Sequence, residues 1–180
     1  MLRRTLLTTA ATTALGFSGP AFAAPAVGQK APDFTLTDTA GKTVRLSDFK
    51  GKHVVLEWVN PGCPYVRKHY DSANMQGTQK EATALGVVWL AINSTESASY
   101  DYLPAAKLAR WMTDQKAAPT ITLMDEDGKA GQSYGARTTP HMYIVNPQGT
   151  LIYAGGIDSI PSSRQEDVKT AVNYVKQGLR

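Results

Sequence analysis

Two continuous apolar runs constrain the fold of this chain more than any other feature of its sequence. They are residues 53–59, HVVLEWV, and residues 87–93, VVWLAIN. Each has the length of a strand and shows no alternation of apolar and polar positions, which is typical of strands buried on both faces of a sheet. Between them, residues 63–85 carry polar and charged side chains over the length of a helix and end at Gly86. This strand–helix–strand order predicts two parallel strands at the centre of an α/β sheet.

Turn and composition signals predict the elements on either side of this unit. Residues 34–49, FTLTDTAGKTVRLSDF, predict two short strands about a turn at the Ala-Gly pair. Residues 104–116 predict a helix with its proline in the first turn, and residues 120–125 predict a strand that ends in a turn. Residues 141–156 predict a hairpin around the sequence NPQG.

A helix is predicted near the C-terminus. Ser163 and Glu166 fit the spacing of a capping box. Apolar residues with a period close to 3.6 follow at Val168, Ala171, Val172 and Val175. The complete order is a hairpin, then β-α-β-α-β, then β-β-α. It predicts an α/β fold in which helices flank a central mixed β-sheet, extended by the N-terminal hairpin.

The first 23 residues have the pattern of a secretory signal. Arg3 and Arg4 precede an apolar stretch, and the sequence Ala-Phe-Ala ends at Ala23. We therefore expect a signal peptide at residues 1–23, cleaved before Ala24, and one domain at residues 24–180. The paired arginines leave a twin-arginine signal open, and a buried N-terminal helix is the structural alternative. Export places the domain in the periplasm or another compartment outside the cytoplasm.

Charge and hydropathy exclude two classes of partner. Loss of the signal leaves 17 basic and 15 acidic residues, a net charge of +2, and the remaining Lys and Arg form no basic run. This distribution indicates no nucleic-acid partner. No apolar run of the mature chain reaches the length of a membrane span.

Cys63, the only cysteine of the chain, lies at the junction between the first buried strand and the helix, in the sequence NPGCPY. A single cysteine cannot form an internal disulfide, so Cys63 is either an inert buried thiol or a reactive one. Turn formers flank it, and Pro64 suits the first turn of a helix. Exposed N–H groups at a helix N-terminus stabilise an anion, and Arg67 follows four residues later. This position favours a reactive thiolate.

Several motifs resemble the thioredoxin-fold redoxins, in particular single-cysteine members of the AhpC/TSA (peroxiredoxin-like) branch. The segment APDFTLTDTAGKTVRLSDFKGKHVVLEWVNPGCPY and the later TTPHMYIVNPQG carry this resemblance, which extends over residues 28–179. It implies a thioredoxin-like fold for the whole mature domain. Cys63 falls on the first cysteine of the thioredoxin C-x-x-C motif, and Val66 replaces the second. Glu57 falls on a buried acid that handles protons, and Pro140, after Thr139, falls on a cis-proline beside the cysteine.

The chain departs from the peroxiredoxin pattern P-x-x-x-[T/S]-x-x-C. In the thioredoxin alignment, Val66 occupies the position of the peroxidatic cysteine, and Cys63 stands where the hydroxyl residue belongs. If Cys63 is aligned with the peroxidatic cysteine instead, Asn60 replaces the hydroxyl residue. Arg137 is a candidate for the peroxide-site arginine, although it lies just before the cis-proline region. The peroxidase residues are therefore incomplete in either alignment.

Alternatives remain open for the other ionisable residues. Glu57 either handles protons for Cys63 or pairs with a cation such as Lys52 or Lys68, because a buried charge is costly when unpaired. His69 and His141 are expected in packing roles. A copper or zinc site of Cys63 with these histidines is the weaker alternative, so no metal and no cofactor are expected.

Together these features predict an exported thiol-dependent oxidoreductase in which Cys63 forms a mixed disulfide that an external thiol resolves. The expected partners are a thiol, disulfide or hydroperoxide substrate and a thiol reductant. The candidate catalytic residues are Cys63, Glu57 and Arg67. The candidate substrate-binding residues are Asn60, Thr139 and Pro140. Two alternatives are a single-cysteine peroxidase, whose thiol passes through a sulfenic acid, and a binding module that captures a cysteine-containing protein or a metal without turnover.

Overall fold

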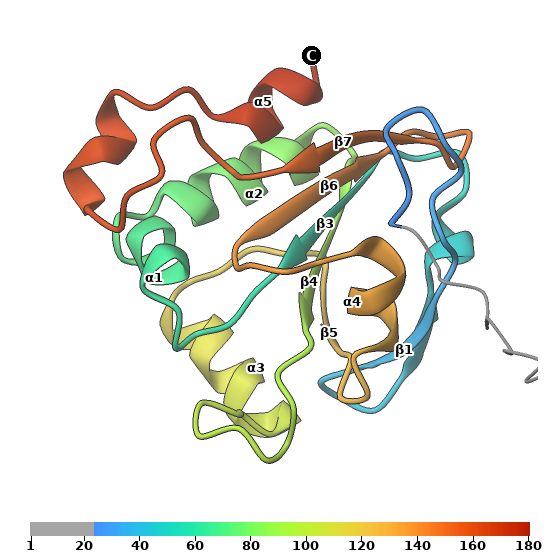
Figure 1. Cartoon of the computed structure of the whole chain (residues 1–180), viewed down its shortest axis with the longest axis horizontal. Coiled ribbons are helices and arrows are strands. Elements are labelled where there is room, and N and C mark those ends of the chain that lie inside the picture. The colour runs from blue at the N-terminus through green and yellow to red at the C-terminus, as the bar shows by residue number, and fades with distance from the viewer. Residues whose placement is uncertain (1–23) are drawn as a thin grey trace, which may run out of the picture.

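The structure, a computed structural model, describes residues 24–180, so the predicted signal segment lies outside the described residues. These residues form one seven-stranded sheet in the order β2-β1-β5-β4-β3-β6-β7 (Figure 1). The strands are β1 (Thr35–Asp38), β2 (Thr43–Arg45), β3 (Val54–Trp58), β4 (Val88–Asn93), β5 (Ile121–Met124), β6 (His141–Val145) and β7 (Leu151–Gly155). The α-helices are α1 (Pro64–Asp71), α2 (Asn74–Ala84), α3 (Ala105–Asp114), α4 (Lys129–Tyr134) and α5 (Tyr174–Gly178). Two 3-10 helices, η1 (Leu46–Phe49) and η2 (Gln165–Lys169), complete the described elements.

The predicted strands and their directions are confirmed. The two apolar runs form β3 and β4, which are parallel neighbours, and β5 continues the parallel set. β6 pairs antiparallel with β3, and the hairpin partner β7 forms one edge of the sheet. The N-terminal hairpin β1–β2 joins the opposite edge through antiparallel pairing of β1 with β5. The sheet is therefore mixed, as the sequence predicts.

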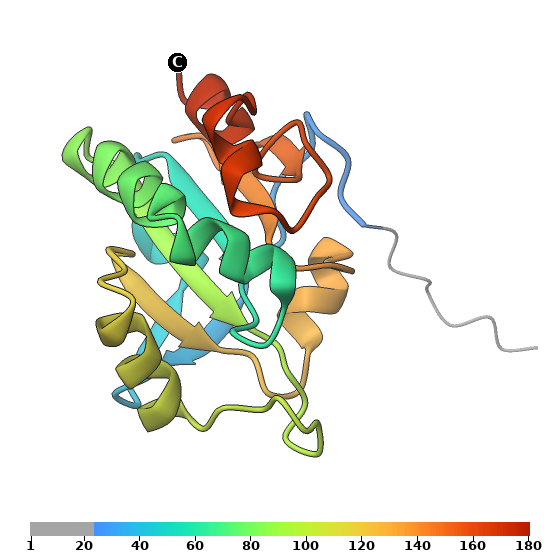
Figure 2. The same cartoon turned by 90° about the vertical axis from the view of Figure 1, so that its left-hand side faces the viewer.

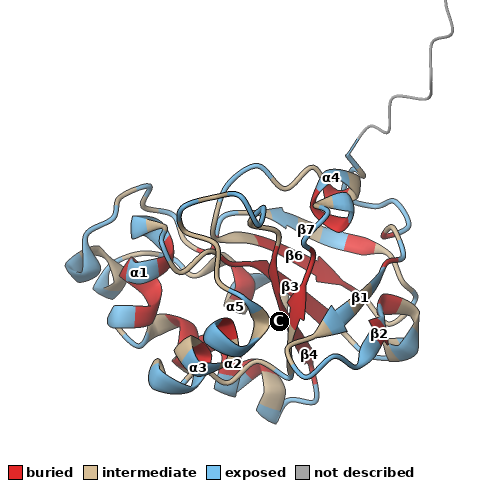
Figure 3. Cartoon of the chain, turned by 90° about the horizontal axis from the view of Figure 1, so that it is seen from below, coloured by how far each residue is buried: buried red, intermediate tan, exposed pale blue. Residues whose placement is uncertain are grey.

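Helices cover both faces of the central strands, which is why those strands carry continuous apolar runs. Alternate residues of β3 point to opposite faces, so Leu56 packs in one core cluster and Val55 in the other. The first cluster includes residues of α4, and the second includes residues of α1, α2, α3 and α5. Figures 1 and 2 show α1, α2 and α5 on one side of the sheet and α4 on the other. The central strands β3 and β4 are buried, whereas the edge strand β2 and its neighbour β1 are more exposed (Figure 3).

The prediction of one helix over residues 63–85 is wrong, because the chain turns between α1 and α2. Ala73 adopts the left-handed conformation, with φ 59°. The carbonyl of Tyr70 accepts hydrogen bonds from the backbone N–H of Ala73 (3.1 Å) and from the side-chain amide of Gln76 (2.9 Å). The first helix ends because these groups satisfy its terminal carbonyl at the turn. The following helix can therefore take a different direction.

The C-terminal helix prediction is also wrong. The segment forms η2 and the short α5, separated by irregular chain, and α5 is capped by the side chain of Asn173. Ser163 caps neither element, and Ser162 and Arg164 instead bind the carboxylate of Asp167. Of the four periodic residues only Val175 is buried. These residues therefore bury too little apolar surface to stabilise a continuous helix.

The helix α4 is absent from the sequence prediction. Its six residues carry no apolar period, and left-handed glycines, Gly128 and Gly135, bound it at both ends. The buried carboxylate of Asp125 accepts hydrogen bonds from the N–H groups of Ala130 (3.1 Å) and Gly131 (2.9 Å). A side chain from the preceding loop thus satisfies the first turn. Within the described residues no helix combines the length and the apolar character needed to cross a bilayer.

The left-handed residue between α1 and α2 leads to a stability prediction. An L-residue with a Cβ pays roughly 1–2 kcal/mol for this conformation, and glycine avoids most of that cost while losing more chain entropy on folding. Ala73→Gly should therefore raise the free energy of unfolding by about 0.5–1 kcal/mol. Ala109→Gly in the middle of α3 is the matched control and should lower it by about 1 kcal/mol. Urea unfolding of both variants checks the pair. Equal losses in both would contradict the account of the turn.

Candidate active site

Cys63 lies between the end of β3 and the first residue of α1. It is the N-cap residue of the helix, and its carbonyl accepts the N–H of Arg67 at 3.0 Å. Its own N–H donates to the carbonyl of Asn60 at 3.0 Å, closing the turn that follows the strand. The side chain is half-buried and its thiol is free. The structure therefore places Cys63 at a helix N-terminus, as the sequence predicts.

The thiol of Cys63 contacts the segment before β6. Its Sγ donates to the carbonyl oxygen of Thr139 at 3.1 Å, and the Thr139–Pro140 peptide bond is cis. Residues 76 positions apart are thus brought together. Thr139 and Pro140 are both half-buried. Their position beside the thiol agrees with the resemblance, and their role in substrate binding stays a prediction.

Asn60 supports the cysteine turn through its side chain. Its Oδ1 accepts the N–H of Gly62 at 2.8 Å, and its Nδ2 donates to Asp101 at 2.5 Å. A Cβ at Gly62 would lie 3.0 Å from the Cβ of Asp101, so this close approach favours glycine. Asp101 is a site residue that the sequence reasoning missed, because it lies 41 residues from Asn60 and no local pattern connects them.

Glu57 is fully buried beneath α1 and α2, and three neutral donors bind its carboxylate. Tyr70 Oη donates to Oε1 at 2.8 Å, while Trp89 Nε1 at 2.7 Å and Gln79 Nε2 at 3.0 Å donate to Oε2. Burial raises the pKa of Glu57, and the three hydrogen bonds partly oppose that rise. The pKa of Tyr70 is also raised, first by burial and then by the neighbouring Glu57 charge.

The alternative of an ion pair between Glu57 and a lysine is wrong. Lys68 binds Asp158 instead, at 2.8 Å, and Lys52 is exposed beside a pocket at the N-terminal end of β3. Among the described residues, the hydrogen bonds to the Glu57 carboxylate all come from uncharged groups. The proton-handling role of Glu57 stays a prediction, since its carboxylate makes no hydrogen bond with Cys63 within residues 24–180.

Arg67 lies on the exposed side of α1. Its Nε lies 3.6 Å from Asp71 Oδ2, and 64% of its side chain is accessible to solvent. An exposed pair of this kind contributes little to stability, about 0.3–0.5 kcal/mol. The guanidinium is thus oriented toward the C-terminal end of its own helix, and its influence on Cys63 stays a prediction.

A buried ionic cluster lies on the other side of α1. Lys68 Nζ donates to Asp158 Oδ2 at 2.8 Å and to the carbonyl of Ile160 at 3.0 Å. His69 Nδ1 lies 2.8 Å from the Asn74 amide, and its Nε2 lies 3.6 Å from the same Asp158 oxygen. Burial, together with the Lys68 charge, lowers the pKa of His69 to about 4 against the opposing effect of Asp158. The cluster ties the chain after β7 to α1.

The second histidine considered at the sequence level packs against an aromatic ring. The His141 and Tyr143 rings are 4.6 Å apart at their centroids, and burial lowers the pKa of His141. The part of the chain that the structure describes contains no group of three His, Cys, Asp or Glu side chains placed to share a metal ion. His141 therefore packs against Tyr143, whereas His69 belongs to the buried ionic cluster.

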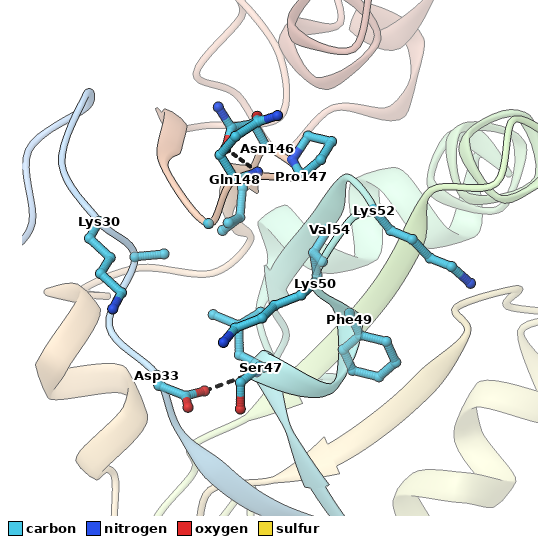
Figure 4. A pocket seen from close by; sticks show the side chains of 14 residues that line it. Lys30, Asp33, Ser47, Phe49, Lys50, Lys52, Val54, Asn146, Pro147 and Gln148 are labelled. Carbon is cyan, nitrogen blue, oxygen red and sulfur yellow. Dashed lines mark hydrogen bonds between the residues drawn. The ribbon is translucent and has the colours of Figure 1, made fainter.

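Two pockets meet at Thr139, beside the thiol. The proline-side pocket, about 330 Å³, is lined by α1, Pro140 and the chain after β7, including Tyr65 and Ile157. The arginine-side pocket, about 440 Å³, lies between the loop after β4 and the loop before β6 and includes Arg137. A third pocket, about 220 Å³ and shown in Figure 4, lies at the opposite end of β3, away from Cys63.

Comparison with known proteins agrees with this fold. Residues 27–154 match the AhpC/TSA family. Thiol-disulfide oxidoreductase ResA of Bacillus subtilis is 26% identical over 132 residues, which cover 69% of this chain and 64% of that protein. The chain thus spans slightly less than two thirds of that relative. Peroxiredoxin Bcp of Bacillus subtilis is 37% identical over 65 residues, covering 34% of this chain and 41% of that protein.

A solved structure gives the same result for the architecture. The thioredoxin domain of a thiol-disulfide oxidoreductase from Bacteroides vulgatus superimposes with a TM-score of 0.59 at 21% identity. The superposition covers 82% of this chain and 98% of that domain. The fold is therefore thioredoxin-like.

The buried His69 leads to a prediction for stability against pH. Because the pKa of His69 falls from 6.5 to about 4 on folding, the unfolded chain binds the proton first as the pH drops. The free energy of unfolding should therefore decrease as pH falls from about 6.5 to 4, by up to roughly 3 kcal/mol from this group. Urea unfolding across this range should show a shallower decrease for His69→Gln than for the wild type.

The comparison isolates His69 from other groups. The raised pKa of Glu57 acts in the opposite direction, and it does so equally in both proteins. A loss of stability in the variant that is the same at every pH would not change the slope of the free energy of unfolding against pH. Parallel curves for the two proteins would show that His69 does not titrate in this way.

Proposed function

The chain belongs to the AhpC/TSA family, and from this premise we propose that it is an exported thiol–disulfide oxidoreductase that reacts through Cys63. The observation that carries the proposal is that Cys63 is half-buried, whereas the position where a second cysteine would lie holds a buried valine. Cys63 is half-buried at the start of α1, against the backbone of Thr139. Val66, one turn later and fully buried, occupies the position of a second cysteine.

The reaction proceeds in two exchanges. Cys63, as its thiolate, attacks one sulfur of a disulfide, so that the substrate S–S bond breaks and a mixed disulfide forms. The released thiolate takes up a proton. An external thiol, as its thiolate, then attacks the substrate sulfur of the mixed disulfide. It forms a new disulfide with that sulfur, and Cys63 leaves as a thiolate. The external thiol is required because the chain contains no second cysteine.

Glu57 is the proposed acceptor for the proton of the Cys63 thiol. Its raised pKa suits a carboxyl group that exchanges protons closer to neutral pH than an exposed one does. Cys63 packs against the core cluster that contains Tyr70 and Trp89, two of the donors to Glu57. The Thr139 carbonyl is too weak a base to take the proton, so a second group has to receive it.

A hydroperoxide is the second candidate substrate, and the partial likeness to peroxiredoxin Bcp favours it. A peroxidase needs hydrogen-bond donors directed at the O–O bond beside the thiolate. Here the Asn60 amide already donates to Asp101, and the Arg67 guanidinium lies beside Asp71. Arg137 is exposed in the arginine-side pocket and makes no hydrogen bond with Cys63 among residues 24–180. The group in contact with the thiol is the Thr139 carbonyl, which is an acceptor. Disulfide exchange has no need of these donors, so we place it first.

Export follows from the sequence signal in this proposal. Arg3, Arg4 and the Ala-Phe-Ala sequence ending at Ala23 support cleavage before Ala24. The reductant in such a compartment is then an extracytoplasmic thiol.

A comparison of two oxidants tests the proposal. Mass spectrometry of the reduced protein mixed with oxidised glutathione should find a glutathione adduct on Cys63 that persists until thiol is added. Sulfenic acid formation with equal hydrogen peroxide should be slower, since absence of one aligned donor costs roughly 100-fold in rate. Cys63→Ser should form neither product. Rapid sulfenic acid formation with negligible glutathione adduct would reverse the order and make the peroxidase the first choice.

A further inference from the structure

The arginine-side pocket is lined in part by two residues that contact Cys63. Its lining includes Asn60, whose carbonyl accepts the N–H of Cys63, and Thr139, whose carbonyl accepts the thiol. The rest of the lining comes from the loop after β4 and the loop that precedes β6. Cys63 does not itself line the pocket, but both Asn60 and Thr139 are hydrogen-bonded to it.

Charges of both signs face this pocket. Arg137 and Glu96 are exposed, and among residues 24–180 neither side chain takes part in an ion pair or a hydrogen bond. Asp101 also lines the pocket, and hydrogen bonds from Ser99 and Asn60 lower the pKa of its carboxyl, which keeps it anionic. The pocket thus offers one free guanidinium and one free carboxylate, with a second carboxylate already bound.

The other two pockets lack this combination. In the proline-side pocket, the charges of Lys68 and Asp158 are buried and bind each other. The third pocket is lined by several lysines. In Figure 4 the side chains of Lys30 and Lys50 extend toward each other, while Lys52 points away. That pocket lies at the far end of β3 and has no access to Cys63.

We propose that the arginine-side pocket recognises the α-amino acid group of a zwitterionic disulfide, of which cystine is the simplest. Arg137 binds the α-carboxylate and Glu96 binds the α-ammonium, since guanidinium and carboxylate are the groups that match these charges. Its volume, about 440 Å³, lies within the range of ligand-binding clefts, about 300–1,000 Å³. The inference rests on the proposed function, because it names the substrate class of the same thiol.

The chemical step is balanced without any further reagent. The Cys63 thiolate bonds to one sulfur of cystine, the cystine S–S bond breaks, and one cysteine leaves as a thiolate that is then protonated. The other half remains on Cys63 as a mixed disulfide, with its ammonium and carboxylate in the pocket. An external thiol releases it in a second exchange.

Four disulfides of similar size but different charge test the proposal. They are cystine, cystamine with ammonium groups alone, 3,3′-dithiodipropionate with carboxylates alone, and the neutral hydroxyethyl disulfide. Mass spectrometry measures the rate of mixed disulfide formation with each. Cystine should react about tenfold faster than the neutral disulfide, because two charge-assisted contacts at an exposed site contribute modestly. The rates with cystamine and with 3,3′-dithiodipropionate, which each carry charges of one sign, should lie between those two rates.

Variants assign the preference to its residues. Arg137→Gln should lower the ratio of the cystine rate to the neutral-disulfide rate toward the ratio seen with cystamine, and Arg137→Lys should retain more of it. Glu96→Gln should lower the ratio and remove the advantage of cystamine. Arg110→Gln, at an exposed position on α3, is the matched control and should keep the full ratio.

The outcomes separate this inference from the proposed function. If none of the four disulfides reacts, disulfide exchange itself is refuted. If all four react at similar rates in the wild type, exchange stands and charge recognition is refuted. A preference for cystine that Arg137→Gln leaves undiminished would equally overturn the assignment of the pocket.

Discussion

The carboxylate of Glu57 connects three elements to β3 from a position that water does not reach. Tyr70 reaches it from α1, Gln79 from α2 and Trp89 from β4. The side-chain Oε1 of Gln79 extends the network by accepting the N–H of Ala118, before β5, at 2.7 Å. Loss of the Tyr70 hydroxyl would leave the buried Oε1 of Glu57 without a donor, at about 1–3 kcal/mol. Because α1 begins immediately after Cys63, the network that holds the helix also fixes the position of the thiol.

The surroundings of the thiol follow from the same framework. The end of β3 lies beside the end of the parallel strand β4. Because β6 runs antiparallel to β3, the chain that precedes β6 lies at the same end of the sheet. The thiol therefore contacts Thr139 instead of a second cysteine, and Val66 fills the core below it. A thioredoxin-like framework is thus combined with a single sulfur, so the second exchange in our account depends on a thiol from outside.

Sequence patterns could predict the parts of the structure that depend on neighbouring residues. The apolar runs identified β3 and β4, and the turn residues around Cys63 placed it at a helix N-terminus. The contacts that complete the site come from distant segments: Asp101 reaches Asn60, and Asp158 reaches Lys68. No local spacing encodes such pairs. The break at Ala73 was missed for a similar reason, because a side chain beyond the turn satisfies the end of α1 and the sequence has no proline or glycine there to indicate it.

In the proposed reaction, the mixed disulfide persists until an external thiol reacts with it, because the chain has no second cysteine. Val66→Cys tests it most directly, since position 66 lies one helical turn from Cys63. After reaction with oxidised glutathione and removal of free thiols, intact-mass measurement should find one glutathione on the wild type. The variant should carry no glutathione and an internal disulfide between positions 63 and 66. A stable glutathione adduct on the variant, or spontaneous loss of the adduct from the wild type, would contradict the account.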